Sequence, residues 1–329
     1  MKLAPQKLAL LVRDIFVRRG MSEAHAALVA DVLVWAELRG MDTHGVMRVP
    51  RYVELIRKGE LNARPSIKVV LDAPACVHLD CDRAAGPVAM MEGVRAACGK
   101  AKAAGIGLAL VRATTHTAAL GYYAQSAARD GFAAIAFAAS VPLMAYHGAR
   151  AAGLGTAPLA IAVPGEDEPF ALDMASSMIS MGSLMQARAA GAAIPEGAAL
   201  AADGSPTTDA RRASIPLPLG GAKGSGLAFM VECLASLLGG NPILAESLGG
   251  STRHKQNGVV IAIDVARFIA PERFREELGR LTAALRALPA QPGAEILMPG
   301  ERGRRNAERA RKGFEIEDNL YQQLAALAA

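Results

Sequence analysis

The most reactive side chains of this sequence lie in two short segments. In the first, 39–52, RGMDTHGVMRVPRY, a helix beginning near His44 would place His44, Arg48 and Tyr52 four residues apart on one face. Arginine binds a carboxylate through two parallel hydrogen bonds, and histidine and tyrosine can donate further bonds to the same anion. The spacing alone, however, slightly favours an ordinary capped helix start with a surface arginine.

The second segment places a histidine at the end of a predicted buried strand. His116 directly follows the apolar run 106–113, IGLALVRA, and its flanking threonines. α/β folds gather ligands and catalytic side chains at the carboxyl ends of strands, and histidine exchanges protons near neutral pH. A general acid–base role and a structural role therefore both fit His116. Ser140 ends the next strand, but no G-x-S-x-G motif surrounds it, which argues against a serine hydrolase.

A third candidate is the glycine-rich segment 219–228, LGGAKGSGLA. Its glycines allow the backbone to approach a ligand. Lys223 lies at the start of the following helix, where the helix dipole favours anions. Close packing of helices through small residues explains the same glycines equally well. No G-x-G-x-x-G or G-x-x-x-x-G-K-[ST] motif occurs, so a Rossmann phosphate turn or a P-loop is not expected.

Apolar periodicity predicts the elements that must position these residues. Helices are expected over 3–19, 22–38 and about 46–59, with Ser22 as the N-cap of the second. From residue 67 strands alternate with helices, which indicates an α/β fold. The expected strands are 67–71, 76–80, 106–113, 132–140, 157–164, 170–175 and 258–264. Further helices are expected at 87–104, before residue 131, at 178–190, 220–240 and 271–287, and in the tail from 303, whereas 194–209 is predicted to be a turn-rich loop.

Charge and composition exclude several classes of protein. The net charge is +5 and aromatic residues make up only 4% of the chain, so a surface that stacks nucleic-acid bases is not expected. Most of the excess charge lies in 301–313, ERGRRNAERARKG, which we interpret as a solvated helix face, with a site for an anionic cofactor group as the alternative. No signal peptide or membrane-spanning run occurs, so we expect no membrane partner.

The cysteines indicate a reducing environment. The four of them are few and irregularly spaced for a disulfide scaffold. Cys76 and Cys81 flank His78, but no further ligands follow at metal-binding spacing, so no metal site is predicted. We therefore expect a cytoplasmic protein.

Taken together, the motifs resemble the malate/L-lactate dehydrogenase family of the non-Rossmann type. This family includes ureidoglycolate and sulfolactate dehydrogenases and piperideine/pyrroline-2-carboxylate reductases. The resemblance covers nearly the whole chain, and the ureidoglycolate branch looks most similar, including the tail GFEIEDNLYQQL. It is carried by residues 43–62, 115–137, 153–164, 172–177, 194–209, 217–228 and 299–324.

The resemblance implies a fold, a reaction and an assembly. It implies a non-Rossmann NAD(P)-binding α/β domain, 71–289, and a helical lobe formed by 1–70 and about 290–329 that contributes to the substrate site and the dimer. The implied reaction is hydride transfer between NAD or NADP and a small 2-hydroxy or 2-keto acid. Reduction of a cyclic imino acid is the alternative. A homodimer or higher homo-oligomer is implied.

The resemblance also assigns roles to individual residues. His116 becomes the proton donor and acceptor, with His44 as its partner, and Arg48 the group that binds the substrate carboxylate, assisted by Thr43 and Tyr52. The cofactor contacts fall on Ser140, Asp173, Met174, Ala175 and Lys223, and no metal is implied.

The chain also departs from the family pattern around the expected pocket. Ala149 and Ala157 replace a glycine and an asparagine that are usual in the family, and Ser183 stands where a basic residue is common. A late substrate-side arginine of some members would fall near Arg253 or His254. These departures leave the substrate and the choice between NAD and NADP open.

Overall fold

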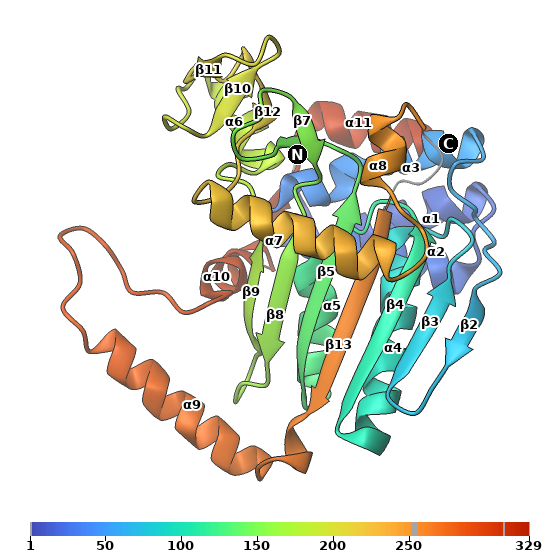
Figure 1. Cartoon of the computed structure of the whole chain (residues 1–329), viewed down its shortest axis with the longest axis vertical. Helices are drawn as coiled ribbons and strands as arrows, with labels where there is room; N and C mark the ends of the chain where they lie inside the picture. Colours follow the sequence, from blue (N-terminus) through green and yellow to red (C-terminus); the bar gives the residue numbers. More distant parts are fainter. Residues whose placement is uncertain (1, 252–255, 312, 329) are drawn as a thin grey trace.

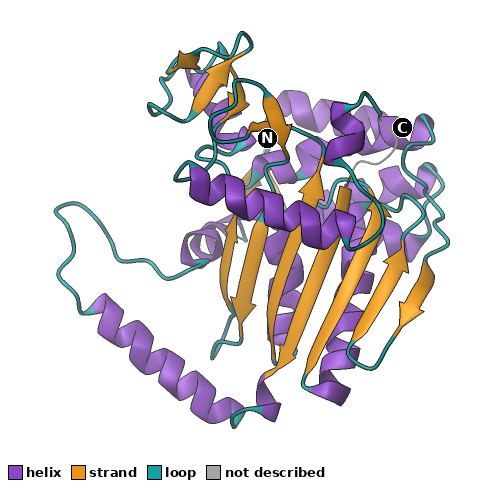
Figure 2. Cartoon of the chain, viewed as in Figure 1, coloured by secondary structure: helices purple, strands orange, loops and turns teal. Residues whose placement is uncertain are grey.

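The computed structural model describes residues 2–251, 256–311 and 313–328, and its centre is a seven-stranded sheet (Figures 1 and 2). The strand order is β2-β3-β4-β13-β5-β8-β9. β3 and β4 are parallel, and every other neighbouring pair is antiparallel. The strands are β2 (Lys68–Asp72), β3 (Cys76–Asp80), β4 (Ile106–Thr114), β5 (Phe132–Ser140), β8 (Leu159–Val163), β9 (Phe170–Met174) and β13 (Gln256–Asp264). The predicted mixture of strands and helices is confirmed as a mixed α/β fold.

Helices cover both faces of the sheet. α4 (Gly86–Ala104) and α5 (Leu120–Arg129) pack behind it, and α7 (Ala222–Glu232) crosses in front, as Figure 1 shows. Small residues bring these layers close together. A Cβ atom at Gly93 of α4 would lie only 2.7 Å from the side chain of Val111 on β4. The abundance of alanine and glycine thus produces a tightly layered core.

The two ends of the chain lie side by side in a helical cover. β1 (Lys2–Leu3) pairs with β14 (Phe314–Glu315). α1 packs against α11, α3 against α11, and α2 against α10. These helices are α1 (Pro5–Arg18), α2 (Glu23–Leu38), α3 (Val49–Arg57), α10 (Glu301–Ala310) and α11 (Asp318–Ala328). The division into a helical lobe and an α/β domain at residues 70 and 290 stays an expectation. One buried hydrophobic cluster contains residues from both of these parts.

One prediction about secondary structure was wrong. The segment 194–209 is not only a turn-rich loop, because it contains β10 (Ala199–Ala201) and β11 (Pro206–Thr207), which join β12 (Ala213–Pro216) in a small sheet. Strands of two or three residues are too short to produce a visible alternation of apolar side chains. With α6 (Met181–Ala190) they enclose a small separate cluster around Leu184.

The remaining elements connect these layers. They are β6 (Met144–Ala145), β7 (Ala152–Leu154), a π-helical extension of α7 (Cys233–Leu237), α8 (Leu244–Leu248), a 3₁₀ turn (Val265–Arg267) and α9 (Pro271–Arg286). α9 stands away from the sheet in Figure 1, and none of its residues is buried. Among the described residues, no helix is both long enough and apolar enough to span a bilayer.

Candidate active site

A cavity of about 550 Å³ lies at one edge of the central sheet. The pairing makes β4, β5 and β9 point the same way, so their carboxyl ends meet at this edge. The cavity has the size of a small-molecule site. Among the predicted site residues, its lining includes Thr43, His44, Arg48, His116, Ser140, Asp173, Met174 and Ala175.

The segment that carries His44 and Arg48 is not one helix. Asp42–His44 forms a 3₁₀ turn, Gly45 is extended, Val46–Arg48 forms a second 3₁₀ turn, and α3 begins only at Val49. The backbone N–H of Val46 donates to Glu37 Oε2 at 2.8 Å, which fixes the break. His44 therefore lies outside the helix expected over about 46–59, so it shares no helical face with Arg48 and Tyr52, although His44 and Arg48 reach the same cavity.

Arg48 is aligned by the backbone of the same segment. Its Nε donates a hydrogen bond to the carbonyl oxygen of Thr43. Its two terminal nitrogens donate no hydrogen bond to another described residue, so both can donate to a carboxylate. The hydroxyl of Thr43 lies 3.2 Å from His44 Nδ1, so Thr43 contacts both Arg48 and His44.

His44 and His116 stack on each other in this cavity. Their ring centroids are 5.6 Å apart and the planes are inclined by 27°. Burial, followed by the charge of Arg48, lowers the pKa of His44 to about 4. Burial, then Arg48 and then His44 hold the pKa of His116 well below its usual range. Both imidazoles are therefore neutral at neutral pH, and a neutral imidazole can accept a proton.

Tyr52 lies behind His116 and not in the cavity wall. Its side chain is fully buried, and its ring packs against Phe16 with centroids 6.1 Å apart. Its hydroxyl lies 2.7 Å from the backbone oxygen of His116 and 3.0 Å from Nδ1 of the same residue. The structure thus gives Tyr52 a contact with His116 where a contact with substrate was predicted.

Asp173 joins the end of β9 to the start of α5. Its Oδ2 accepts a hydrogen bond from the backbone N–H of Gly121 at 2.8 Å. Removal from bulk water within the cavity raises the pKa of Asp173 to about 6, against the lowering effect of Gly121. A Cβ atom at Gly121 would lie 2.8 Å from the same carboxylate oxygen, so this approach requires glycine.

The remaining wall has features that suit a nicotinamide cofactor. Small apolar side chains, among them Ala118, Ala138 and Ala175, leave room for a flat ring, and Ser140 and Asp173 supply polar groups. The first turn of α6 also faces the cavity, and Ser180 caps this helix by accepting from Ser183 N. A helix N-terminus favours a phosphate or carboxylate.

Lys223 does not belong to this cavity lining. It is exposed at the start of α7. Packing explains at least one neighbouring glycine, because a Cβ atom at Gly224 would lie 2.6 Å from the backbone of Leu219. A cofactor contact by Lys223 stays a prediction.

The polar residues of the cavity that sequence reasoning missed include Gln186, Gln256 and Arg302. Gln256 Oε1 accepts from Thr117 N at 2.8 Å, which ties β13 to the loop that carries His116. Arg302 belongs to the basic run interpreted as a solvated face, where no local signal separates a cavity arginine from its neighbours. Arg253 and His254, near which a late arginine was expected, lie outside the described residues. The described residues contain no cluster of metal-ligating side chains.

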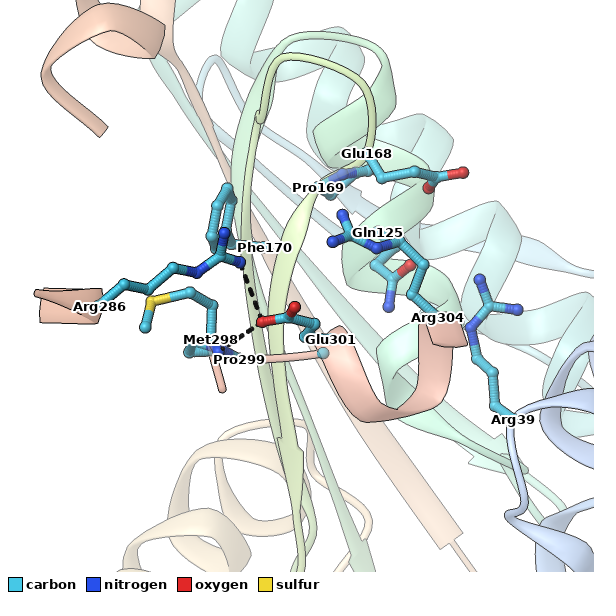
Figure 3. Close-up of a pocket in the computed structure, with 11 residues that line it drawn as sticks. Arg39, Gln125, Glu168, Pro169, Phe170, Arg286, Met298, Pro299, Glu301 and Arg304 are labelled. Carbon is cyan, nitrogen blue, oxygen red and sulfur yellow. Dashed lines mark hydrogen bonds and ion pairs between the residues drawn. The ribbon is translucent and has the colours of Figure 1, made fainter. Parts of the chain in front are cut away.

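A second, smaller hollow lies between α10, the end of α9 and β9 (Figure 3). Arg286 donates to Glu301 at 3.1 Å, and the same carboxylate oxygen accepts from Met298 N at 3.0 Å. Its lining includes none of the predicted site residues. The ion pair ties the end of α9 to the start of α10.

The comparison with known protein families agrees with this geometry. Residues 3–325 match the model of the malate/L-lactate dehydrogenase family. The chain belongs to this family. Members of the malate/L-lactate dehydrogenase family are oxidoreductases that act on the CH–OH group of 2-hydroxy acids.

Individual relatives cover nearly the whole chain. An L-sulfolactate dehydrogenase of Methanocaldococcus jannaschii is 36% identical over 98% of this chain and 95% of its own. A solved structure of sulfolactate dehydrogenase from the same organism superposes with a TM-score of 0.90 at 35% identity. The superposition covers 99% of this chain and 96% of that one. An NAD(+) ureidoglycolate dehydrogenase of Escherichia coli is 34% identical over 98% of this chain and 95% of its own. A pyrroline/piperideine-2-carboxylate reductase of Pseudomonas putida is 32% identical over 96% and 94%. These identities are too similar to single out the ureidoglycolate branch.

Proposed function

We propose that the chain is an NAD(P)-dependent dehydrogenase that interconverts a small 2-hydroxy acid and its 2-keto acid. One observation carries the proposal. Arg48, two neutral histidines and an enclosed wall of small side chains converge on a single cavity. An anion-binding arginine beside a neutral general base is what oxidation of a 2-hydroxy acid requires.

Each residue then has a distinct task. The terminal nitrogens of Arg48 hold the substrate carboxylate, and His44 orients the substrate oxygen. His116 takes the proton of the hydroxyl group in oxidation and returns a proton to that oxygen in reduction. The nicotinamide, when bound, accepts or supplies the hydride.

The cofactor proposal rests on the far wall of the cavity. Ser140, Asp173, Met174 and Ala175 line it and would hold the nicotinamide end. Lys223 is proposed as a contact for a more distant part of the cofactor, because it is exposed at a helix start. Either NAD or NADP fits these contacts, and an assay with both separates them.

A second candidate is reduction of a cyclic imino acid. The relative from Pseudomonas putida carries that activity in its name. The same cavity serves this reaction, because Arg48 would hold the carboxylate and His116 would control the proton at nitrogen. Cyclic amino acid products from cyclic imines, with no turnover of keto acids, would select this candidate.

We also propose that the protein is a cytoplasmic homodimer or a larger homo-oligomer. The four cysteines are free in the structure, in keeping with a reducing compartment. The helix α9 carries an apolar stripe of Phe274, Leu278, Leu281 and Leu285, and Leu281 is 56% exposed. An unburied stripe of this kind is typical of a surface that packs against a second copy.

One spectrophotometric screen tests the proposed function. Purified protein is mixed with NADH or NADPH and with a panel of C3–C5, ureido-substituted and sulfonated 2-keto acids and cyclic imines, and absorbance of the reduced nicotinamide is followed. Oxidation of the cofactor by at least one keto acid is the expected result. Cofactor binding with no turnover across the whole panel would contradict the proposal.

A further inference from the structure

The hydroxyl group of Tyr52 makes two contacts with His116, and together they determine where the histidine carries its hydrogen. The hydroxyl oxygen lies 2.7 Å from the backbone oxygen of His116 and 3.0 Å from Nδ1 of its ring. The two rings are nearly perpendicular, at 75°, with centroids 5.9 Å apart. Tyr52 is fully buried, so water does not compete for these contacts.

The number of hydrogens decides the direction of both bonds. A backbone carbonyl can only accept a hydrogen bond, so the Tyr52 hydroxyl must donate its single hydrogen to the backbone oxygen of His116. Its oxygen can then only accept from Nδ1, and Nδ1 must carry a hydrogen. We propose that Tyr52 is a positioning residue that fixes the neutral His116 ring as the Nδ1–H tautomer, leaving Nε2 as the atom that exchanges the proton with substrate.

The surroundings support this assignment. Nε2 of His116 has no hydrogen-bond partner among the described side chains and is not one of the buried unpaired atoms, so it is open to the cavity. The charged and titratable groups next to the ring are Arg48 and His44 on the segment before α3 and Tyr52 on α3. The same cavity is also lined by Asp42, Asp173 and Arg302. Burial and the charge of Arg48 lower the pKa of His116 and so keep its ring neutral. Only a neutral imidazole has two tautomers to choose between.

The backbone oxygen that receives the Tyr52 hydrogen is itself held in place. A Cβ atom at Gly86 of α4 would lie 2.1 Å from this oxygen, so α4 presses directly against the loop. On the other side, Gln256 holds Thr117 N. The Tyr52 bond to the backbone is therefore set by the fold, and the bond to Nδ1 follows from it.

This role predicts a specific defect in Tyr52→Phe. Phenylalanine keeps the packing against Phe16 but removes both contacts, so the ring is free to adopt the Nε2–H form, which cannot accept the hydroxyl proton. Resting on the proposed function, we expect kcat to fall several-fold, in proportion to the share of the His116 ring that changes to the Nε2–H form. KM for the substrate should stay unchanged, because Tyr52 does not line the cavity.

The direct test is ¹⁵N NMR of histidine-labelled protein without substrate. The sequence holds six histidines, and His116→Gln identifies the signals of His116 by their loss. In the wild-type protein at neutral pH, Nδ1 should show the protonated type of shift and Nε2 the unprotonated type. In Tyr52→Phe the two shifts should move toward each other as both tautomers become populated.

Tyr123→Phe is the matched control. Tyr123 is also a fully buried tyrosine, and it donates to the backbone oxygen of Thr117, the next residue of the same loop. The Tyr123→Phe variant should leave the tautomer of His116 unchanged. A wild-type His116 in the Nε2–H form, or an identical spectrum in Tyr52→Phe, would overturn the proposal. Because the NMR test needs no substrate, its outcome is separate from that of the keto-acid screen.

Discussion

Arg48, the proposed carboxylate-binding residue, also influences the protonation of the two neighbouring histidines. Arg48 lines the cavity, and its charge adds to the effect of burial in lowering the pKa of both His44 and His116. A bound carboxylate would offset this charge. Substrate binding would therefore make His116 a better proton acceptor at the moment when a proton has to be accepted.

Replacing Arg48 tests its part in substrate binding. Arg48→Lys keeps the positive charge but cannot make two parallel bonds to a carboxylate. Loss of one charge-assisted hydrogen bond corresponds to roughly a 10- to 100-fold rise in KM. We expect kcat to change much less, as measured by steady-state kinetics on the acid found in the screen. An unchanged KM would show that another group holds the carboxylate.

Residue types predicted the site better than spacing did. His116 was indicated because it follows a buried strand, and that signal is local in the sequence. The contact between Tyr52 and His116 joins residues 64 positions apart, so no periodicity contains it. The family resemblance assigned the two histidines and Arg48 to one site. The helical face considered for His44, Arg48 and Tyr52, which the spacing alone did not favour, does not form.

At the scale of elements, Glu37 of α2 holds the segment that carries His44. Its carboxylate accepts from Val46 N, and a Cβ atom at Gly45 would lie 2.0 Å from it. Burial raises the pKa of Glu37 to about 7, against the lowering effect of the Val46 bond. This contact between residues nine positions apart holds the 3₁₀ turns ahead of α3 in place, and no local apolar pattern indicates it.

The raised pKa of Glu37 makes stability depend on pH. From about pH 4.5 to about pH 7 the folded protein binds this proton more tightly than the unfolded chain, so stability should fall as the pH rises and level off above about 7. In Glu37→Gln that part of the fall should disappear. Thermal unfolding across this range measures it, with exposed Glu23→Gln on the same helix as the control. Equal slopes for wild type and Glu37→Gln would contradict the assignment.

The start of α4 fixes the loop that carries His116. Gly86→Ala would place a Cβ atom 2.4 Å from Thr117 Cα as well as against the His116 backbone oxygen. We expect a loss of about 1–3 kcal/mol in unfolding free energy, together with reduced turnover. In Gly99→Ala, on the same helix, the Cβ atom meets nothing within 4 Å, so a gain of about 0.4–1 kcal/mol is expected. Denaturant unfolding of both variants measures the difference, and equal effects would be inconsistent with this packing.

Elements with strong local patterns were predictable. The N-cap of α2 is confirmed, since Ser22 Oγ accepts from His25 N at 3.2 Å, and Gly105 ends α4 in a left-handed conformation. The place of β13 between β4 and β5 was not predictable. Val259 pairs with Leu110 and Phe137, each more than a hundred residues away. Such strand pairings depend on the whole fold and cannot be predicted from the sequence pattern of a short segment.

At the scale of the whole molecule, α9 is joined to the body by its two ends. The Arg286–Glu301 pair connects its last turn to α10, and Arg267, just before α9, donates to the carbonyl oxygen of Lys102. Within the described part of the chain, Leu281 and Leu285 of the apolar stripe between these points stay exposed, and Phe274 and Leu278 are half-buried. An arm of this form suits an interface with a second copy.

Charges on the stripe should disrupt the proposed dimer. Leu281→Glu combined with Leu285→Glu places two carboxylates on the exposed apolar face. We expect light scattering after gel filtration to give twice the 34.1 kDa chain mass, or a multiple of it, for the wild type and a smaller species for the double variant. Glu276→Lys, on the opposite face of α9, should leave the mass unchanged. A wild-type protein that stays a monomer would contradict the proposal.

The central claim is that His116 exchanges the substrate proton in a nicotinamide-dependent reaction. The most direct test is the turnover number of His116→Ala on the acid found in the screen, with cofactor binding measured in parallel by the fluorescence of the reduced nicotinamide. We expect a loss of about 10²- to 10⁴-fold in kcat with cofactor binding retained. Wild-type turnover in His116→Ala would contradict it.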